Sequence, residues 1–335
     1  MNLFELGDFQ LASGATLPGA RLAYQTFGEL NAAKDNVVVF PTFLGAPAEV
    51  LNGWIGENRP LDPRKYFIVL PGHFGLAPSS APSNTPAPLA GPDFPAVSIA
   101  DDVVAQQRLL AERFDVHEVH LVLGWSIGAI QVYEWALRFG DVVRRVAPIA
   151  GAPTPPPWTK LWLRTVVEEP ITADPNWNGG TYAEAAAVSG GLTRVAHGSA
   201  LTAPPRTFYY DSAEVWRNLG FDSVDGFVAG FWEGFWLPQD PNDVVVQARK
   251  ARTAWPGADG ESLRDVLGRV KPKATVAALT GDNLFPPDEC RQYAEWIPSA
   301  EFRQIDSIFG HLATFGLSEQ DVKAIDDVIR HALEG

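Results

Sequence analysis

A serine flanked by glycines stands out as a candidate nucleophile, in the motif Gly124-Trp125-Ser126-Ile127-Gly128. The motif follows the apolar run Leu121–Leu123 and precedes a helix-like segment over residues 130–139. A serine on a sharp turn from strand to helix projects its hydroxyl above the sheet, and the flanking glycines are needed because a Cβ would clash there. The pattern predicts that Ser126 attacks a carbonyl carbon, with the backbone N–H of Ile127 facing the resulting oxyanion.

A serine hydroxyl needs a general base and an acid that orients this base, and two residues late in the chain fit these roles. Asp282 follows a strand predicted to end at Thr280, and His311 follows a strand predicted to end near Ile305. The order serine, acid, histidine, each near the end of a strand, is that of the α/β-hydrolase fold. We therefore expect a catalytic triad of Ser126, Asp282 and His311.

Other acidic and histidine residues are weaker candidates. Asp306 also lies near a strand end and is the alternative acid. His73 follows a strand but precedes Ser126 in the chain. The remaining histidines lie at the start of the serine's strand, in the central insertion and on the last helix: His117, His120, His197 and His331.

The composition fits a globular enzyme and argues against several function classes. With 335 residues, 46% of them hydrophobic and 20% charged, the chain can form one large α/β domain with an insertion. The net charge of −14, without a cluster of Lys and Arg, argues against nucleic-acid or anionic membrane partners. No apolar run could span a membrane and the N-terminus does not resemble a signal peptide, so we expect a cytoplasmic protein. The single cysteine, Cys290, excludes an internal disulfide, and we expect it to serve in packing or at the surface.

The order of predicted elements indicates an α/β-hydrolase fold, a mostly parallel central sheet with helices on both faces. Residues 4–30 read as an antiparallel hairpin at a sheet edge, and Ser98 is expected to cap a helix. Further strands are predicted over residues 37–41, 66–71, 121–123, 143–150, 274–280 and 301–305. The core is therefore expected to comprise residues 1–151 and 269–335.

Residues 152–268 break this alternation and are expected to form a helical cap over the active site. Tryptophans concentrate here, at positions 158, 162, 177, 216, 232, 236 and 255. An aromatic-rich insertion between two sheet strands fits a lid over the carboxyl edge of the sheet, and most of these rings are expected to form the cap's own core. On the core side, a backbone N–H in the loop Thr42–Ala46 could face the same oxyanion as Ile127.

Four stretches resemble the homoserine O-acetyltransferase family of α/β-hydrolase-fold enzymes, with a similarity running from about Phe4 to the C-terminus. They are Leu123–Ala129, Asp174–Gly180, Gly281–Pro287 and Gly310-His311. The resemblance implies the triad of Ser126, Asp282 and His311 with an acyl-enzyme on Ser126. It also implies an oxyanion hole made by the N–H groups of Ile127 and Phe43, and a homodimer.

Several positions depart from the family pattern near the expected acceptor site. Leu312 follows the histidine where the family has an aspartate that helps to hold the homoserine amine. The arginine expected for the acceptor carboxylate falls on Ala196, and Arg194 comes two residues early. Trp125 replaces a glycine beside the nucleophile, and Phe40–Gly45 differs from the family's oxyanion loop. Leu312 and Trp125 suggest a less polar substrate pocket, in which Arg194 is the candidate cation.

These departures favour ester hydrolysis over acetyl transfer to homoserine. A zwitterion cannot be held in a dry pocket without counter-charges, because unpaired ions there cost several kcal/mol. Water is then the simplest second nucleophile, and the chemistry requires no metal or organic cofactor. The alternative is acyl transfer from acyl-CoA to homoserine or another small alcohol, with Arg194 or Arg206 holding the acceptor. A binding protein on the same scaffold is a third alternative, against which the intact triad argues.

Overall fold

The computed structural model describes residues 1–210 and 214–335, and within them one eight-stranded sheet runs through the molecule in the order β1-β2-β4-β3-β5-β6-β7-β8. Its strands are β1 (Asn2–Gln10), β2 (Thr16–Phe27), β3 (Val37–Val39), β4 (Phe67–Pro71), β5 (Val119–Trp125), β6 (Val143–Ile149), β7 (Lys273–Leu279) and β8 (Ala300–Ile305). The hairpin β1–β2 and the pair β2–β4 are antiparallel, and all other pairs are parallel. The predicted α/β-hydrolase fold is confirmed.

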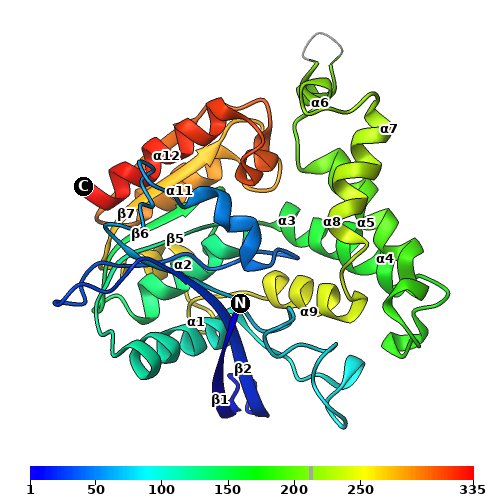
Figure 1. Cartoon of the computed structure of the whole chain (residues 1–335), viewed down its shortest axis with the longest axis horizontal. Helices are drawn as coiled ribbons and strands as arrows, with labels where there is room; N and C mark the ends of the chain where they lie inside the picture. Colours follow the sequence, from blue (N-terminus) through cyan, green and yellow to red (C-terminus); the bar gives the residue numbers. More distant parts are fainter. Residues whose placement is uncertain (211–213) are drawn as a thin grey trace.

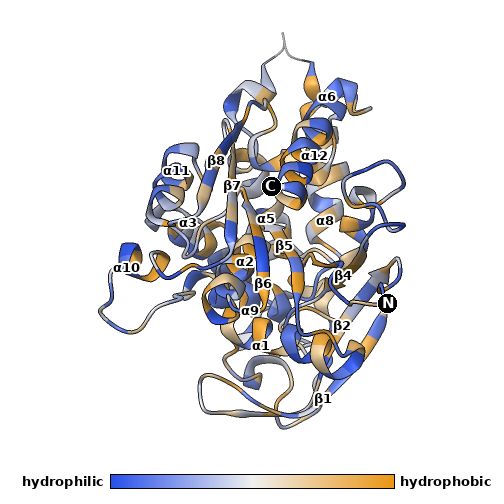
Figure 2. Cartoon of the chain, turned by 90° about the vertical axis from the view of Figure 1, so that its left-hand side faces the viewer, coloured by the Kyte–Doolittle hydropathy of each residue, from blue (hydrophilic) through white to orange (hydrophobic). Residues whose placement is uncertain are grey.

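The strands in the middle of the sheet are buried because their sequences are continuous apolar runs. All residues of β3 and β4 are buried, whereas β8 at the edge is mostly exposed or half-buried. A strand covered on both faces reads as a run of apolar residues, and an edge strand keeps polar ones. Figure 2 shows β5 to β8 side by side, with alternating orange and blue along the neighbouring helix α12 (Glu319–Glu334), whose apolar residues face the core.

Helices cover both sides of the sheet, as predicted. The helices α1 (Ile99–Arg108) and α2 (Ile127–Arg138) lie on one side of the strands and α12 lies on the other (Figure 1). The helix α11 (Pro287–Trp296) packs against β7 and β8. Ser98 forms the predicted capping box, because its side chain accepts from the Asp101 N–H while the Asp101 carboxylate accepts from the Ser98 N–H.

Between β6 and β7 the described residues form helices and turns but no strand. The helices are α3 (Pro157–Trp162), α4 (Glu169–Thr172), α5 (Ser189–Thr202), α6 (Val215–Asn218), α7 (Val224–Phe227), α8 (Gly234–Trp236), α9 (Pro241–Arg252) and α10 (Leu263–Leu267). Figure 1 shows α4 to α8 standing beside the sheet, with α9 between them and the core. The buried tryptophans of this segment are Trp162, Trp177, Trp216, Trp232 and Trp236. None of the helices described combines the length and apolar character needed to cross a bilayer.

Candidate active site

Ser126 lies on a sharp turn between the end of β5 and the start of α2. Its backbone angles are φ 57° and ψ −127°, a combination that a non-glycine residue rarely adopts. The neighbouring glycines permit this turn. A Cβ on Gly124 would lie 2.8 Å from the backbone carbon of Gly128, and a Cβ on Gly128 would lie 3.0 Å from the carbonyl oxygen of Pro41. The strand, turn and helix predicted around the serine are therefore all present.

Gly124→Ala should destabilise the protein, because the added methyl group would overlap backbone that cannot give way. We expect a loss of about 1–3 kcal/mol in the free energy of unfolding, the range for overpacking a buried site. Urea denaturation of the variant and the wild type measures it. Gly53→Ala is the matched control, because a Cβ at Gly53 meets no atom within 4 Å. An equal midpoint for Gly124→Ala and the wild type would contradict the prediction.

Asp282 and His311 meet at the ends of neighbouring strands. Asp282 follows β7 and His311 lies in the 3-10 helix Gly310–Phe315 after β8, and these strands are paired in parallel. His311 Nδ1 lies 2.8 Å from Asp282 Oδ2, with both side chains buried. The other oxygen, Asp282 Oδ1, accepts hydrogen bonds from the N–H groups of Leu284 at 2.8 Å and Phe285 at 3.0 Å.

The second ring nitrogen of His311 is available for chemistry at Ser126. Nε2 makes no hydrogen bond within the described residues, and His311 lines the same cavity as Ser126. With Nδ1 donating to Asp282, the neutral imidazole has a free lone pair on Nε2, so this nitrogen can accept the proton of the serine. Phe285 further fixes the ring, with the two ring centres 5.6 Å apart.

The alternative acid and the other histidines lie elsewhere. Asp306 is exposed, and the carboxylate that pairs with His311 is that of Asp282. Four of the remaining histidines bond to surface carboxylates or to a backbone carbonyl: His117 to Asp115, His120 to Leu333, His197 to Glu233 and His331 to Glu301. His73 is fully buried against the loop that carries Phe43.

Two backbone amides are available for an oxyanion. Ile127 N–H begins α2, and Phe43 N–H lies in the loop after β3. In residues 1–210 and 214–335, neither amide donates to a protein acceptor, and both residues line the cavity beside Ser126. A buried N–H without a partner is rare, so two of them beside a candidate nucleophile fit an oxyanion hole.

The cavity beside Ser126 is small and has an apolar wall. Its volume is about 50 Å³. The polar side chains that line it are Ser126, Thr159, Ser199 and His311. The apolar residues are Phe43, Leu44, Ile127, Ile130, Pro155, Trp162, Leu163, Ala203, Trp232, Phe235, Trp236, Ala251, Leu284, Phe285 and Phe315. No Lys, Arg, Asp or Glu of the described chain is among them.

The expectation that Trp125, Leu312 and Arg194 line the pocket is corrected, because none of the three is among the lining residues. Trp125 is fully buried against Phe40 and Trp54, with ring centres 4.6 and 5.0 Å away. Leu312 is also fully buried, whereas Arg194 is exposed on α5. The side chain beside the nucleophile points into the core since alternate residues of a strand face opposite sides. Arg206 is exposed as well and supplies no cation to the cavity.

Cys290 does not line the cavity beside Ser126. Cys290 is fully buried, and burial raises the pKa of its thiol well above the ordinary value, which keeps the thiol protonated. It therefore serves in packing. Over the described ranges no group of three or more His, Cys, Asp and Glu side chains could hold a metal ion.

The stretch Asp174–Gly180, which the family resemblance singled out, supports the fold instead of the cavity. Asp174 Oδ2 accepts from the N–H of Gly191 at 2.7 Å, in the first turn of α5. The Gly180 carbonyl accepts from the Asn242 side chain at 2.9 Å, in the first turn of α9. The stretch thus fixes two helices of the insertion relative to each other.

Sequence reasoning missed a buried polar cluster behind the Phe43 loop. Lys250 and Asp102 form an ion pair with both side chains fully buried, and His73 contacts Lys250. A signal was present, because Asp243, Gln247 and Lys250 recur at helical spacing on a face of α9 that is otherwise apolar. The residues of the segment 152–268 that line the cavity had no comparable signal.

Comparison with known proteins places these features in context. The family model of the alpha/beta hydrolase fold matches residues 35–315. An ethyl acetate hydrolase of Pseudomonas veronii is 38% identical over 330 residues, covering 97% of this chain and 93% of the relative. A homoserine O-acetyltransferase of Trichormus variabilis is 33% identical, covering 90% of this chain and 86% of the relative. The crystal structure of the acetyl esterase MekB superposes with a TM-score of 0.96 at 37% identity, covering 100% of this chain and 96% of the other.

Proposed function

The chain belongs to the alpha/beta hydrolase fold family and is an acyl-transfer enzyme that cleaves carboxylic esters or related acyl compounds, and we propose that its substrates are esters of short acyl groups, acetyl esters above all. The small apolar cavity beside Ser126 carries this proposal. Its volume of about 50 Å³ and its wall of large apolar side chains suit a small acyl group such as acetyl better than a long acyl chain.

The proposed mechanism assigns a role to each member of the triad. Ser126 Oγ attacks the acyl carbon while His311 Nε2 takes the hydroxyl proton, and Asp282 stabilises the imidazolium that forms. The N–H groups of Ile127 and Phe43 stabilise the oxyanion of the tetrahedral intermediate. His311 then donates the proton to the leaving alcohol, and the acyl group stays on Ser126. In the second half, His311 takes a proton from water as the water oxygen attacks the acyl carbon, and it returns this proton to Ser126 Oγ as the acid is released.

Water as the acceptor follows from the lack of charge in the cavity. A homoserine molecule carries an ammonium and a carboxylate, each of which would need a partner in this apolar space. The described lining has none, so acyl transfer from acyl-CoA to homoserine is disfavoured. We propose that residues 152–268 act as the cap of this site, because they supply Trp162, Trp232 and Trp236 to its wall.

A partition experiment tests the proposed reaction. Purified protein is given p-nitrophenyl acetate with and without excess homoserine, with Ser126→Ala as the blank. We expect acetate release that homoserine does not change, and kcat/KM that falls from acetyl to butyryl to octanoyl esters. Formation of O-acetylhomoserine would contradict hydrolysis as the main reaction, and a preference for octanoyl esters would contradict the short-acyl proposal.

We further propose that the protein forms a homodimer through the cap, as the family resemblance implies. A groove on the cap surface is lined by Ala200, Leu201, Val224, Val228 and Ala229 together with His197, Tyr209, Asp225 and Glu233. Its exposed apolar residues are Leu201, which is 79% exposed, Val224 and Ala229. Apolar side chains exposed together in this way are typical of interfaces. Sedimentation velocity should give a dimer for the wild type and a monomer for Leu201→Glu. A monomeric wild type at micromolar concentration would contradict this proposal.

A further inference from the structure

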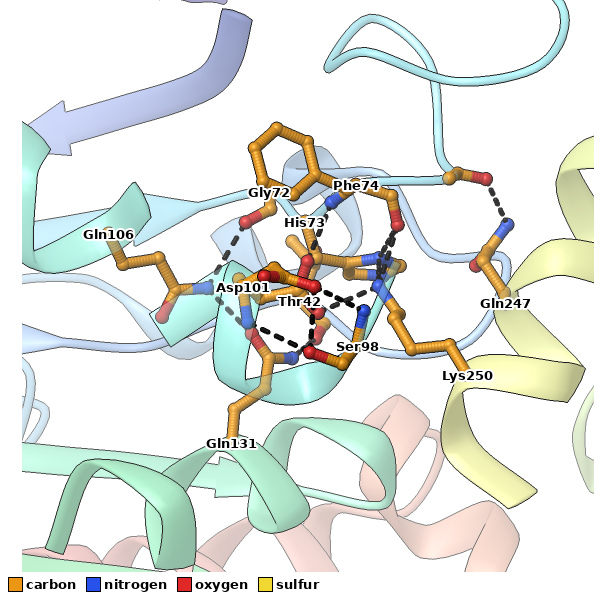
Figure 3. A network of polar contacts seen from close by, with 12 residues as sticks. Thr42, Gly72, His73, Phe74, Ser98, Asp101, Gln106, Gln131, Gln247 and Lys250 are labelled. Carbon is orange, nitrogen blue, oxygen red and sulfur yellow. Dashed lines mark hydrogen bonds and ion pairs between the residues drawn. The ribbon is translucent and has the colours of Figure 1, made fainter. Parts of the chain in front are cut away.

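A buried polar cluster lies directly behind the loop of residues 42–45, which carries the proposed oxyanion donor Phe43 N–H. Figure 3 shows its side chains converging from different parts of the chain, with Gln131 from α2, Lys250 and Gln247 from α9, and His73 from the segment after β4. Within the described residues, the side chains of the cluster make no hydrogen bond with Ser126, Asp282 or His311. The proposed mechanism gives it no role.

The Lys250–Asp102 ion pair anchors the cluster. Lys250 Nζ lies 2.7 Å from Asp102 Oδ2, 2.6 Å from the Phe74 carbonyl oxygen and 3.0 Å from His73 Nδ1. Nζ thus has three acceptors within 3.0 Å, which suits an ammonium group, and the Asp102 carboxylate favours the charged form against the burial that lowers the pKa of Lys250. Asp102 Oδ1 accepts from the Phe74 N–H at 2.9 Å. The ion pair therefore binds both the N–H and the carbonyl of Phe74.

The ion pair also decides the tautomer of His73. Because the Lys250 ammonium donates to Nδ1, this nitrogen is unprotonated, and the neutral ring carries its proton on Nε2. Burial, with the charge of Lys250 in addition, lowers the pKa of His73 to about 3, so the ring stays neutral. Nε2 lies 3.4 Å from the Phe43 carbonyl oxygen and donates to it.

The rest of the loop backbone is held in the same way. Gln131 Nε2 donates to the Thr42 carbonyl at 2.9 Å, and Gln247 Oε1 accepts from the Gly45 N–H at 2.9 Å. The Gly45 carbonyl accepts from Gln239 Nε2 at 2.6 Å. Side chains thus hydrogen-bond to the carbonyls of Thr42 and Phe43. The Phe43 N–H between them has no protein acceptor in the described residues.

We propose that His73, Lys250 and Gln247 are positioning residues for ester hydrolysis, which hold the loop of residues 42–45 so that the Phe43 N–H stays directed at the oxyanion. The inference rests on the proposed function, because it takes Phe43 as an oxyanion donor. Electrostatic stabilisation depends on donors that are fixed before the reaction, since a donor that must reorient loses part of its effect. Two of these residues lie on α9, so the last long helix of the cap takes part in fixing the oxyanion hole.

Stability alone does not account for the ion pair. A buried pair of charges loses much hydration, and apolar side chains of similar volume often hold a fold at least as well. Here Lys250 donates to the Phe74 carbonyl and contacts His73, while Asp102 accepts from the Phe74 N–H through Oδ1 and faces the ammonium through Oδ2. These contacts orient the backbone at Phe74 and the His73 ring, which in turn contacts the Phe43 carbonyl.

His73→Phe tests the proposal, because phenylalanine keeps the ring but cannot donate to the Phe43 carbonyl. Two quantities are measured on the full chain, the kinetics with p-nitrophenyl acetate and the inhibition constant of a trifluoromethyl ketone. Ser126 adds to this ketone, and the oxyanion of the resulting hemiketal occupies the hole. We expect kcat to fall about tenfold with KM within about twofold, and the inhibition constant to rise by a similar factor, less than the 10²–10³-fold loss for a deleted donor.

Thr154→Val is the matched control, because it removes one buried hydrogen bond, to the Ala254 carbonyl at 2.7 Å, without touching the loop. It should lower the melting temperature and leave both kinetic quantities unchanged. A merely structural cluster would make His73→Phe behave like this control, and that result would overturn the proposal. If His73→Phe does not fold, Gln247→Met takes its place with the same expectations.

A crystal structure of the wild type with the trifluoromethyl ketone gives an independent answer. The oxyanion should lie within hydrogen-bond distance of Phe43 N, with the contact between His73 Nε2 and the Phe43 carbonyl retained. An oxyanion bound away from Phe43 would overturn the inference while leaving hydrolysis at Ser126 intact. Failure of the proposed function itself is distinguishable, because then the wild type would release no acetate or Ser126→Ala would release as much.

Discussion

Ser126→Ala should lower kcat for p-nitrophenyl acetate by at least about 10⁴-fold, because no acyl-enzyme can form on a methyl group. The remaining rate over the uncatalysed reaction would come from the oxyanion donors and from binding alone. KM should change little, since the serine hydroxyl contributes little to binding of the ester. Covalent labelling by a fluorophosphonate probe provides a second readout. The probe should label the wild type and should not label Ser126→Ala.

The triad should act as a unit, which gives this prediction a strict control. His311→Ala should cost about as much as Ser126→Ala, and the double variant should cost no more than either alone, since each removes the same reaction step. Both variants should keep the near-ultraviolet circular dichroism of the wild type. Substantial hydrolysis by a folded Ser126→Ala protein would contradict the assignment of the nucleophile.

The turn that carries the candidate nucleophile could be predicted because its signal is local. The residues that make the turn at Ser126 are contiguous in the chain, and the clash that excludes a Cβ at Gly124 lies within the same motif. Asp282 and His311 required one further step, that parallel strands end at the same edge of a sheet. The pairing of β7 with β8 brings them together.

The pocket could not be predicted because its wall depends on which way side chains point. Trp125 borders the nucleophile in sequence, yet the alternation along β5 turns it toward Phe40 and Trp54. Arg194 lies near the expected position of a substrate-binding arginine, but the register of α5 exposes it. Which tryptophans of the cap face the cavity likewise follows from packing between short helices, for which the sequence carries no periodic signal.

Lys250 illustrates a different limit. A lysine at the end of an amphipathic helix is usually solvated, and here it is fully buried because Asp102, far away in the sequence, lies opposite it. Only the three-dimensional arrangement reveals that its charge is compensated. The departures from the acetyltransferase pattern did indicate a less polar pocket, although the residues that make it apolar are different ones and the candidate cation Arg194 is absent from it.

Asp282→Asn should lower kcat by about 10⁴-fold with little change in KM, because it reverses the tautomer of His311. Two backbone N–H groups, from Leu284 and Phe285, point at Oδ1, so the asparagine must keep its carbonyl oxygen there and turn its NH₂ toward His311 Nδ1. Nδ1 then accepts a hydrogen bond, the ring proton moves to Nε2, and Nε2 can no longer take the proton of Ser126. Nitrogen-15 NMR of the histidine ring would report this exchange of the protonated nitrogen. Asp306→Asn is the matched control and should leave kcat unchanged, since Asp306 is exposed; a comparable loss there would mean that Asp282 is not the acid of the triad.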